Sequence, residues 1–356
     1  MILYYDFIMP QILAFESFDG GSHKQFRETL TKHSSHSWEW ITRPARSWKW
    51  RLAISANEMV DEAMRRGVAK PDGIFVTSMT DSATLRSILP NGWRDIPLIV
   101  YMHENQAEYP TNDERDASFA ITNFQSIMSA DLTIFNSKWN LDSFIIGIEK
   151  LLKKSNDLEL SNIEQRVRDK STVAWIPVEL PPFKIAQKEQ PSDIVRVVWP
   201  HRWEHDKGAD RLLDIAREYT DELNLRWIIL GEQFKTIPES LLQFKDEFEN
   251  KIDHMGYVQS KIEYWEWLSK ADWVLSTAQH EFFGIAVVEA LFANCLPWLP
   301  ETLSYRELLP ACARNLSPGN PPDQNVMESV AQHLYMAQAI PATERIDSLI
   351  TSCLDA

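Results

Sequence analysis

The chain has 356 residues, of which 44% are hydrophobic and 24% are charged, and its formal net charge is −15. This length exceeds what one hydrophobic core usually serves, so we expect two domains. The acidic balance argues against indiscriminate binding to nucleic acid or to anionic membranes, although a local basic patch is compatible with RNA binding. The three cysteines are widely spaced and form no CxxC pair, which argues against a disulfide framework or a structural zinc site.

The first residues, MILYYDFIMP, are apolar but lack a basic n-region and a small-residue cleavage site. We therefore expect them to lead into a first strand rather than to form a signal peptide. No apolar run approaches the roughly 18 residues that a membrane-spanning helix needs, so we expect no stable membrane association. Together with the cysteine pattern, this predicts a cytoplasmic protein.

Short apolar runs alternate with helix-like segments in the first half of the chain. The expected strands are residues 11–17, 73–78, 97–103, 131–137 and 171–177. A turn into a helix follows the first of them, and further helices are expected near residues 55–67, 116–129 and 138–153. This alternation predicts a parallel sheet covered by helices.

The second half repeats the scheme without repeating the sequence. The expected strands are residues 194–200, 225–231, 252–257, 273–278 and 295–300, and the expected helices lie near residues 208–219, 238–250, 260–270 and 284–293. We therefore predict an α/β fold of two doubly wound, Rossmann-like domains that face a cleft. The predicted boundaries are residues 1–182, a Pro- and Gln-rich linker at 183–193, and residues 194–356 with a C-terminal helical tail. Ligands of such sheets bind outside the carboxyl ends of the strands.

The stretch WPHRWEHDKG follows the first strand of the second domain and precedes a helix. It carries Arg202 and Lys207, five residues apart, where a helix start would add unpaired N–H groups and a positive dipole end. Arginine grips phosphate through two hydrogen bonds and lysine adds a point charge. An anion-binding site is one interpretation, and a solvated loop is the other.

The stretch HEFFGIAVVEA places Glu281 and Glu289 eight residues apart with Gly284 between them. Gly284 would let the backbone approach a ligand at a helix start. Glu289 would lie in an apolar and therefore buried helix, so its carboxylate needs a partner, which the hydroxyls of a ribose or a sugar could supply. By spacing alone, a capping or solvated glutamate is the alternative.

Two polar stretches follow strands of the first domain. In ESFDGGSHKQ, Gly20 and Gly21 offer backbone donors beside a helix start, and His23 follows them; a tight turn is the alternative. In YMHENQAEYP, His103 and Asn105 belong to a polar cluster at a strand end, and a structural histidine is the alternative there. The second stretch would match the zinc motif HExxH only with a histidine at position 107, which is alanine, so we expect no metal.

The stretch ITRPARSWKWR contains four basic residues, two tryptophans and no acid. Its candidate RNA-binding residues are Arg43, Arg46, Trp48, Lys49, Trp50 and Arg51. Bases of single-stranded RNA stack on aromatic rings while basic side chains neutralise phosphates. A surface face on which the long side chains extend into solvent is the alternative.

Taken together, these motifs resemble the glycosyltransferase-like domain-containing group, to which the tRNA-queuosine α-mannosyltransferases belong, within the retaining GT-B glycosyltransferases of family 4. Glu281 and Glu289 match the E-x7-E pattern of family 4, and Arg202 and Lys207 match its diphosphate-binding pair. GGSHKQ, PARSWKWR, HENQ, FNS and WPHRWEHDK look like motifs of the narrower group. The resemblance covers residues 12 to about 310.

The resemblance implies a GT-B enzyme that transfers a hexose, mannose from GDP-mannose, with retention of the anomeric configuration and without a cofactor. Catalytic roles would fall to Arg202 and Lys207 at the departing diphosphate, to Glu281 at the sugar hydroxyls and to His103 at the junction of sugar and acceptor. Other donor contacts are expected from Gly20, Gly21, His23, Gly231, Gly256, Phe282, Phe283, Gly284 and Glu289. Glu289 would hold the ribose, and backbone groups near Gly231 and Gly256 would read the base.

The acceptor that the resemblance implies is queuosine in the anticodon loop of a tRNA, bound by the basic and aromatic residues named above and by Asn105. Two alternatives remain open. The first keeps the donor but transfers the sugar to a lipid or glycan, with the lysine-rich segment 138–154 as a membrane-docking helix. The second is a nucleotide-sugar-binding protein or an epimerase on the same fold.

Overall fold

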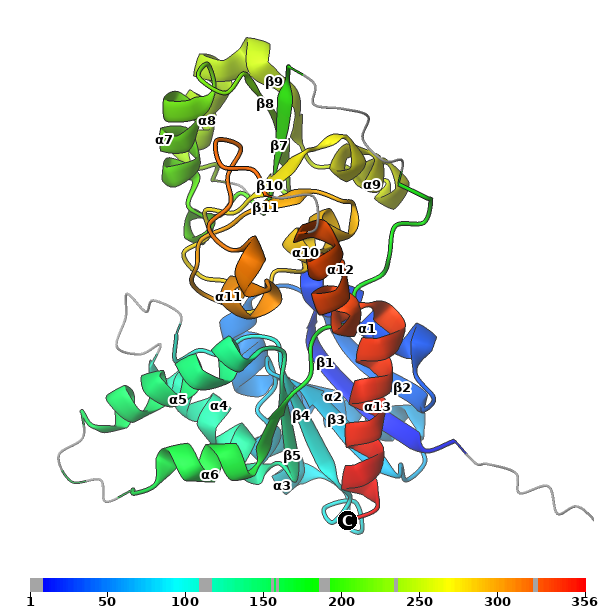
Figure 1. The fold of residues 1–356 in the computed structure, drawn as a ribbon. Helices are drawn as coiled ribbons and strands as arrows, with labels where there is room; N and C mark the ends of the chain where they lie inside the picture. The colour runs from blue at the N-terminus through cyan, green and yellow to red at the C-terminus, as the bar shows by residue number, and fades with distance from the viewer. Residues whose placement is uncertain are drawn as a thin grey trace, which may run out of the picture. The chain divides into compact units, whose positions relative to one another are not determined.

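The structure is a computed structural model that describes residues 9–108, 117–154, 157, 160–185, 193–233, 236–322 and 326–356. The chain divides into two compact units. The first consists of Met1–Pro177 together with Ala339–Ala356, and the second of Val178–Gln338. Both are parallel α/β structures, as the alternating pattern predicted, and each is described below by itself (Figure 1).

The first unit is built on a six-stranded parallel sheet in the order β2-β1-β3-β4-β5-β6. The strands are β1 (Gln11–Asp19), β2 (Ser37–Pro44), β3 (Gly73–Thr77), β4 (Leu98–Met102), β5 (Leu132–Phe135) and β6 (Ser171–Val173). β3 and β4 are buried along their whole length, as expected of central strands covered on both faces. The chain changes direction across the sheet between β1 and β3, so the carboxyl end of β1 is a topological switch point.

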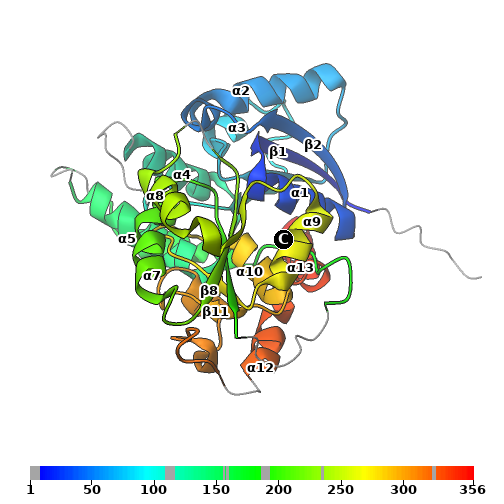
Figure 2. The ribbon, with the colours of Figure 1, turned by 90° about the horizontal axis from the view of Figure 1, so that it is seen from above.

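Helices cover both faces of this sheet. They are α1 (Gly21–His33), α2 (Trp48–Arg66), α3 (Ser82–Ile88), α4 (Ala117–Ser129), α5 (Lys138–Leu152), α6 (Ile163–Asp169) and α13 (Ala339–Leu354). Leu13 and Phe15 of β1 share a core with residues of α2 and α3, whereas Ile12 faces Leu354 of α13. Figure 2 shows β1 between α3 on one side and α1 on the other.

The second unit has a five-stranded parallel sheet in the order β11-β10-β7-β8-β9. Its strands are β7 (Val195–Pro200), β8 (Leu225–Leu230), β9 (Ile252–Gly256), β10 (Trp273–Leu275) and β11 (Leu296–Trp298). Its helices are α7 (Ala209–Tyr219), α8 (Glu239–Phe248), α9 (Lys261–Lys270), α10 (Ile285–Phe292), α11 (Tyr305–Leu308) and α12 (Val326–His333), with 3-10 turns η2 (His205–Lys207), η3 (Glu249–Lys251), η4 (Ala311–Ala313) and η5 (Leu334–Ala337). The switch point lies between β7 and β10. The WPHRWEHDKG stretch begins at the end of β7, and the E-x7-E residues follow β10.

The predicted domain boundaries differ from the structure at the C-terminus. The prediction assigned residues 194–356 to the second domain, but α13 belongs to the first unit. Asp347 of α13 accepts hydrogen bonds from the Ser34 hydroxyl (2.7 Å) and from the backbone N–H and hydroxyl of Ser35 (2.6 and 2.8 Å). These contacts link positions more than 300 residues apart, which the local pattern could not show. Most of the predicted linker, residues 186–192, lies outside the described residues.

Several elements were missed or misplaced by the sequence analysis. β2, α3 and α6 were not predicted, and α2 begins at Trp48 rather than near residue 55. The basic–aromatic stretch is therefore partly an edge strand and partly the first turns of a helix, with Ser47 between them in a left-handed conformation (φ 52°). The three cysteines are free. Among the described helices, none is both long enough and apolar enough to cross a bilayer.

Candidate functional site

The loops at the carboxyl edge of the second sheet pack backbone against backbone. A side chain at Gly208 would bring its Cβ within 2.1 Å of the Thr277 carbonyl oxygen, and one at Gly231 would come within 1.9 Å of the His201 carbonyl oxygen. Both glycines also have positive φ angles, 69° and 147°. Glycine is thus required at both positions, and its absence of a side chain lets the loops after β7, β8 and β10 meet.

Lys207 and Glu281, which the sequence analysis assigned to one ligand, meet in the structure. The Lys207 ammonium donates to the His280 carbonyl oxygen (2.9 Å) and pairs with carboxylate oxygens of Asp206 (3.0 Å) and Glu281 (3.5 Å). Its side chain is only 8% exposed. Burial opposes the charged form, but the two carboxylates outweigh it and raise the pKa of Lys207 above 10.5. The loop therefore holds a fixed positive charge at the carboxyl end of β7.

Arg202 adds a second, more accessible cation to this loop. Its side chain is 47% exposed, and its guanidinium pairs with Glu204 at 3.1 Å. The loop ends at Gly208, where α7 begins with the unpaired N–H groups of a helix N-terminus. Two cations and a helix start thus lie on one short loop, with each cation paired to a carboxylate, and the anion site stays a prediction.

His201 sits beside these cations and was not predicted as a site residue. Its ring is buried and lies edge-on to Trp199, with a centroid distance of 5.1 Å. Burial and the charges of Lys207 and Arg202 lower the pKa of His201 from 6.5 to about 3. His201 is therefore neutral in the folded protein at physiological pH.

We expect acid to destabilise the fold through this histidine. Below pH 6.5 the unfolded chain takes up a proton at His201, but the folded protein does not until about pH 3. The unfolded state then binds more protons, so the free energy of unfolding falls by about 1.4 kcal/mol per pH unit in this window. The free energy of unfolding can be measured by urea unfolding at several pH values between 7 and 5. In His201→Asn it should change less with pH than in the wild-type protein. His333 is exposed, so His333→Asn is the control. If the free energy of unfolding of His201→Asn depends on pH as strongly as that of the wild-type protein, the expectation is contradicted.

The E-x7-E segment forms a second part of the site. Gly284 precedes α10 with a φ angle of 93°, and a Cβ there would lie 3.1 Å from the ring of Tyr305. Phe282 and Phe283 are buried, so their backbone rather than their side chains would face a ligand. The predicted position of Gly284 at a helix start is confirmed.

Glu289 is buried on α10, with 2% of its surface exposed. Its Oε1 pairs with the ammonium of Lys261, and its Oε2 accepts a hydrogen bond from the Tyr264 hydroxyl (2.9 Å). Burial and the nearby carboxylate raise the pKa of Tyr264 well above 10, so this hydroxyl remains a donor. The predicted burial of Glu289 is confirmed, but its partners in the structure are Lys261 and Tyr264, whereas the sequence predicted the hydroxyls of a ribose or a sugar.

Gly231 and Gly256 end the neighbouring strands β8 and β9. The Gly231 N–H donates to the Gly256 carbonyl oxygen (3.3 Å), and both residues have φ angles near 146° that favour glycine, 147° and 145°. Tyr257 follows with 61% of its surface exposed. The two glycines thus lie side by side at the carboxyl ends of their strands, and their role in binding the base stays a prediction.

In the first unit, the Gly20–Gly21 turn touches the start of the basic–aromatic stretch. Asp19 and Pro44 are paired in the sheet, and a Cβ at Gly20 would lie 2.4 Å from that of Ala45. Gly21 begins α1 with a φ angle of 50°. The absence of a side chain at Gly20 therefore lets the loops after β1 and β2 pack together.

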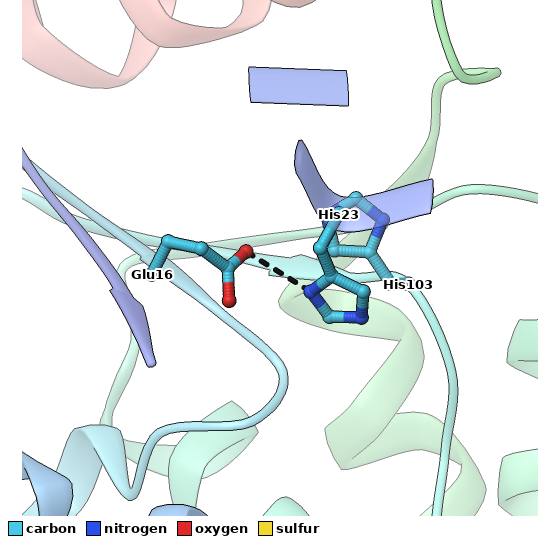
Figure 3. Close-up of side chains that lie close together, drawn as sticks. All are labelled: Glu16, His23 and His103. Atoms are coloured by element: carbon cyan, nitrogen blue, oxygen red, sulfur yellow. Dashed lines mark hydrogen bonds and ion pairs between the residues drawn. The ribbon is translucent and has the colours of Figure 1, made fainter. Parts of the chain in front are cut away.

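His23 and His103 come together with Glu16, a residue that the sequence analysis did not single out (Figure 3). The Nδ1 of His23 lies 3.0 Å from the Glu16 carboxylate, and the two imidazoles are 4.1 Å apart between centroids at an angle of 36°. All three side chains are buried, and neither ring nitrogen of His103 has a hydrogen-bond partner among the residues that the structure describes. Burial and the neighbouring His23 hold the pKa of His103 well below 6.5. A carboxylate at the end of an apolar strand was the available signal for Glu16.

Glu16, His23 and His103 are also the described residues whose ligand atoms come within 4.8 Å of one another, so a divalent cation could be held there. Ligands of one ion direct their lone pairs towards a common centre. The two imidazole rings are tilted by 36° relative to each other, with their centroids 4.1 Å apart. The absence of a metal stays a prediction.

The predicted RNA-binding residues fall into two groups. Arg43 is buried and pairs with Glu58 (2.7 Å) and Glu62 (3.5 Å), while Arg51 pairs with Glu58 (3.3 Å). The structure thus gives these two arginines internal partners, which the acid-free stretch itself does not contain. Arg46, Lys49 and Trp50 are exposed, and Trp48 packs against Phe119.

Asn105 also differs from its predicted role as an acceptor contact. Its side chain is fully buried, and its amide donates to Asn140 and Ser143. Its Oδ1 accepts from the backbone N–H groups of Ala107 (3.1 Å) and Glu108 (2.9 Å). Asn105 therefore shapes the loop after β4 rather than presenting an amide to a ligand.

Comparison with known proteins gives matches along both units. Residues 11–178 match the tRNA-queuosine alpha-mannosyltransferase N-terminal family, and residues 182–299 match the glycosyl transferases group 1 family. The chain is 32% identical over 313 residues to the tRNA-queuosine alpha-mannosyltransferase of Drosophila melanogaster, which covers 85% of this chain and 82% of that protein.

Solved structures with the same fold include Anabaena Alr3699/HepE in complex with UDP and glucose, and the apo form of the lipopolysaccharide outer core galactosyltransferase WaaB. The TM-scores are 0.64 and 0.62 at sequence identities of 14% and 11%. Each comparison covers 97% of this chain, and 100% and 99% of the other. These likenesses assign the two units to the GT-B class.

Proposed function

Because the chain belongs to the tRNA-queuosine alpha-mannosyltransferase family, we propose that it transfers mannose from GDP-mannose to queuosine in the anticodon loop of a tRNA. The glycosyl transferases group 1 segment makes the chain a glycosyltransferase. The single observation that best supports the proposed donor chemistry is the buried Lys207 ammonium, held by Asp206 and Glu281 beside Arg202.

The leaving group explains why such a cation is needed. When the bond between the anomeric carbon and the diphosphate breaks, negative charge grows on the diphosphate. Lys207 and Arg202 are positive before the reaction begins, and Lys207 is fixed by its three contacts. A charge that is already in place stabilises the transition state without reorganisation during the reaction. The start of α7 would add backbone N–H donors to the same oxygens.

Retention of the anomeric configuration is part of the same proposal, and so are the roles of Glu281 and Glu289. Glu281 holds Lys207 on one side and would accept from the hydroxyls of the sugar. Glu289 would accept from the hydroxyls of the ribose, which are neutral donors suited to a buried carboxylate. His103 and His23 would form a polar wall at the acceptor side.

For the acceptor, the exposed residues Arg46, Lys49 and Trp50 offer the chemistry that a single-stranded loop requires. An exposed indole can stack on an unpaired base, and the two cations can meet phosphates. An enzyme that acts on mature tRNA would meet it in the cytoplasm, so a cytoplasmic location is part of the proposal.

The alternative with a lipid or glycan acceptor is not favoured by the packing of α5. Leu141, Phe144, Ile145 and Ile148 of this helix are buried in the core of the first unit. A membrane-docking helix must keep its apolar face for the lipid, whereas α5 uses that face internally. The epimerase alternative makes a different product, because an epimerase converts the donor without any acceptor.

Transfer of labelled mannose from GDP-mannose to bulk tRNA tests the proposed function. We expect label in a queuosine-containing pool and none in a queuosine-free pool. Arg202→Ala should lower the rate of labelling by roughly a hundredfold. Label in both pools would contradict the proposed acceptor, and no label in either would contradict the mannose-transfer proposal. A converted sugar nucleotide in a reaction without tRNA would instead identify an epimerase.

A further inference from the structure

Lys261 occupies a position where the helix itself does not favour a lysine. It is the first residue of α9, and Ser260 caps the helix by accepting from the Glu263 N–H (3.3 Å). The N-terminus of a helix carries a partial positive charge, so a cation in the first turn is unfavourable. An interaction outside α9 therefore has to account for this side chain.

Glu289 supplies that interaction. Its carboxylate is 3% exposed, whereas the Lys261 side chain that pairs with it is 52% exposed. A buried carboxylate needs a charged or hydrogen-bonding partner to offset its loss of hydration. Lys261 thus forms the solvent-facing side of an otherwise buried group, and a ligand that reaches Glu289 from solvent meets Lys261 as well.

The cation keeps donors available after this pairing. An ammonium has three N–H donors, and Glu289 takes one of them. The rings of Tyr264 and Trp265 lie below it, with centroids 4.7 and 5.5 Å from the nitrogen, and fix its position. Oε1 of Glu289 accepts from Lys261 and Oε2 accepts from Tyr264, and every carboxylate oxygen has two lone pairs.

A vicinal diol complements this arrangement. Each hydroxyl of a ribose has one hydrogen to donate and an oxygen that can accept. The carboxylate can accept the hydrogens while the ammonium donates to one of the oxygens, so the ion pair does not have to separate when the ligand binds. A neutral diol also leaves the charge balance between Lys261 and Glu289 unchanged.

We propose that Lys261 is a ribose-binding residue that donates to a hydroxyl oxygen of the nucleotide while Glu289 accepts from the diol. Lys261 thereby makes donor binding depend on an intact ribose. The inference rests on the proposed function in one respect, because it takes Glu289 as the residue that meets the ribose of a nucleotide-sugar.

The test compares the binding of GDP with that of 2′,3′-dideoxy-GDP by calorimetry, with UDP and 2′,3′-dideoxy-UDP run in parallel. We expect Lys261→Met to weaken binding of the ribonucleotide about tenfold, the loss of one charge-assisted hydrogen bond. Its affinity for the dideoxynucleotide should change by less than about twofold. Lys270→Met is the matched control, because Lys270 ends the same helix and lies 4.0 Å above the Trp267 ring.

Two results would overturn the inference. Equal weakening of both nucleotides by Lys261→Met would mean that the lysine acts only through the charge of Glu289 or by attraction of the diphosphate. Unchanged or tighter ribonucleotide binding would mean that Lys261 does not contact the ribose or competes with it. If Lys261→Met does not fold, Lys261→Arg keeps the ion pair, and its planar donors should lower the preference for ribose about threefold.

Failure of the proposed function gives a different result. A wild-type protein that binds the uridine nucleotides in place of GDP would change the proposed donor but leave the test of Lys261 intact. If the wild-type protein binds the ribose and dideoxy forms equally, Glu289 does not bind the ribose hydroxyls. The inference about Lys261 then fails as well. A protein that binds none of the four nucleotides would contradict the nucleotide-sugar proposal itself.

Discussion

Replacing Arg202 with alanine should lower kcat for sugar transfer by roughly a hundredfold or more, the size expected when one group that stabilises developing charge is removed. The Arg202 side chain is half exposed and its ion pair with Glu204 lies at the surface, so the fold should tolerate the change. The diphosphate becomes more negative as its bond to the sugar breaks. KM should therefore rise less than kcat falls, because the lost interaction is strongest in the transition state.

Steady-state kinetics with the sugar donor and tRNA measures this split, and thermal unfolding reports on the fold. Arg211→Ala, an exposed arginine on α7 in the same unit, is the matched control and should retain wild-type rates. Arg202→Lys should recover part of kcat, because it restores the charge but not the planar pair of donors. A rise in KM with unchanged kcat would assign Arg202 to ground-state binding and contradict this expectation.

The combined substitution of Arg46, Lys49 and Trp50 by alanine should weaken tRNA binding by about a hundredfold. Loss of one stacked base accounts for roughly 1–3 kcal/mol of this effect, and two phosphate contacts account for the rest. The plot of log affinity against log salt should lose about 1.4 units of slope, because each phosphate contact on a single strand contributes about 0.7.

Binding of tRNA across a series of salt concentrations measures both quantities. Lys153→Ala with Lys154→Ala removes two exposed cations from the end of α5 and should leave the slope nearly unchanged. The Lys153/Lys154 variant and the Arg46/Lys49/Trp50 variant can lose the same amount of salt dependence. The attraction of tRNA is then spread over the surface, and Arg46, Lys49 and Trp50 are not a specific RNA site. Arg43 and Arg51 are left intact, because their removal would take away the ion pairs of Glu58.

Local pattern was sufficient for the parts of the site that a single segment builds. The apolar run before Arg202 predicted a strand, and the segment after Lys207 predicted a helix. The loop between them was therefore expected at the carboxyl edge of the sheet. The burial of Glu289 followed from the apolar residues around it on one helix. In each case the physical cause, a strand end or a helix face, lies within about ten residues of the side chain.

Hydrogen-bond and ion-pair partners that lie in other segments of the chain could not be predicted from the local pattern. Nothing near Arg43 indicated that Glu58 and Glu62 of the following helix would neutralise it. The polar residues around Asn105 predicted a contact with the acceptor. In the structure the Asn105 amide is buried and donates to Asn140 and Ser143 of α5. Lys261 carried a usable signal, since a cation at a helix start contradicts the helix dipole, and such a misplaced charge predicts a partner elsewhere in the fold.

The return of α13 to the first unit has a consequence for the order in which a ribosome can complete the two units. The second unit is one continuous stretch, Val178–Gln338, whereas the first needs both ends of the chain. When residue 338 has just been synthesised, the nascent chain holds all of the strands described above, yet Ser34 and Ser35 still lack Asp347. Residues Ala339–Ala356, which are synthesised after the whole of the second unit, then complete the unit that was begun first. A chain that terminates before α13 would therefore carry a complete second unit and a first unit that lacks one of its helices.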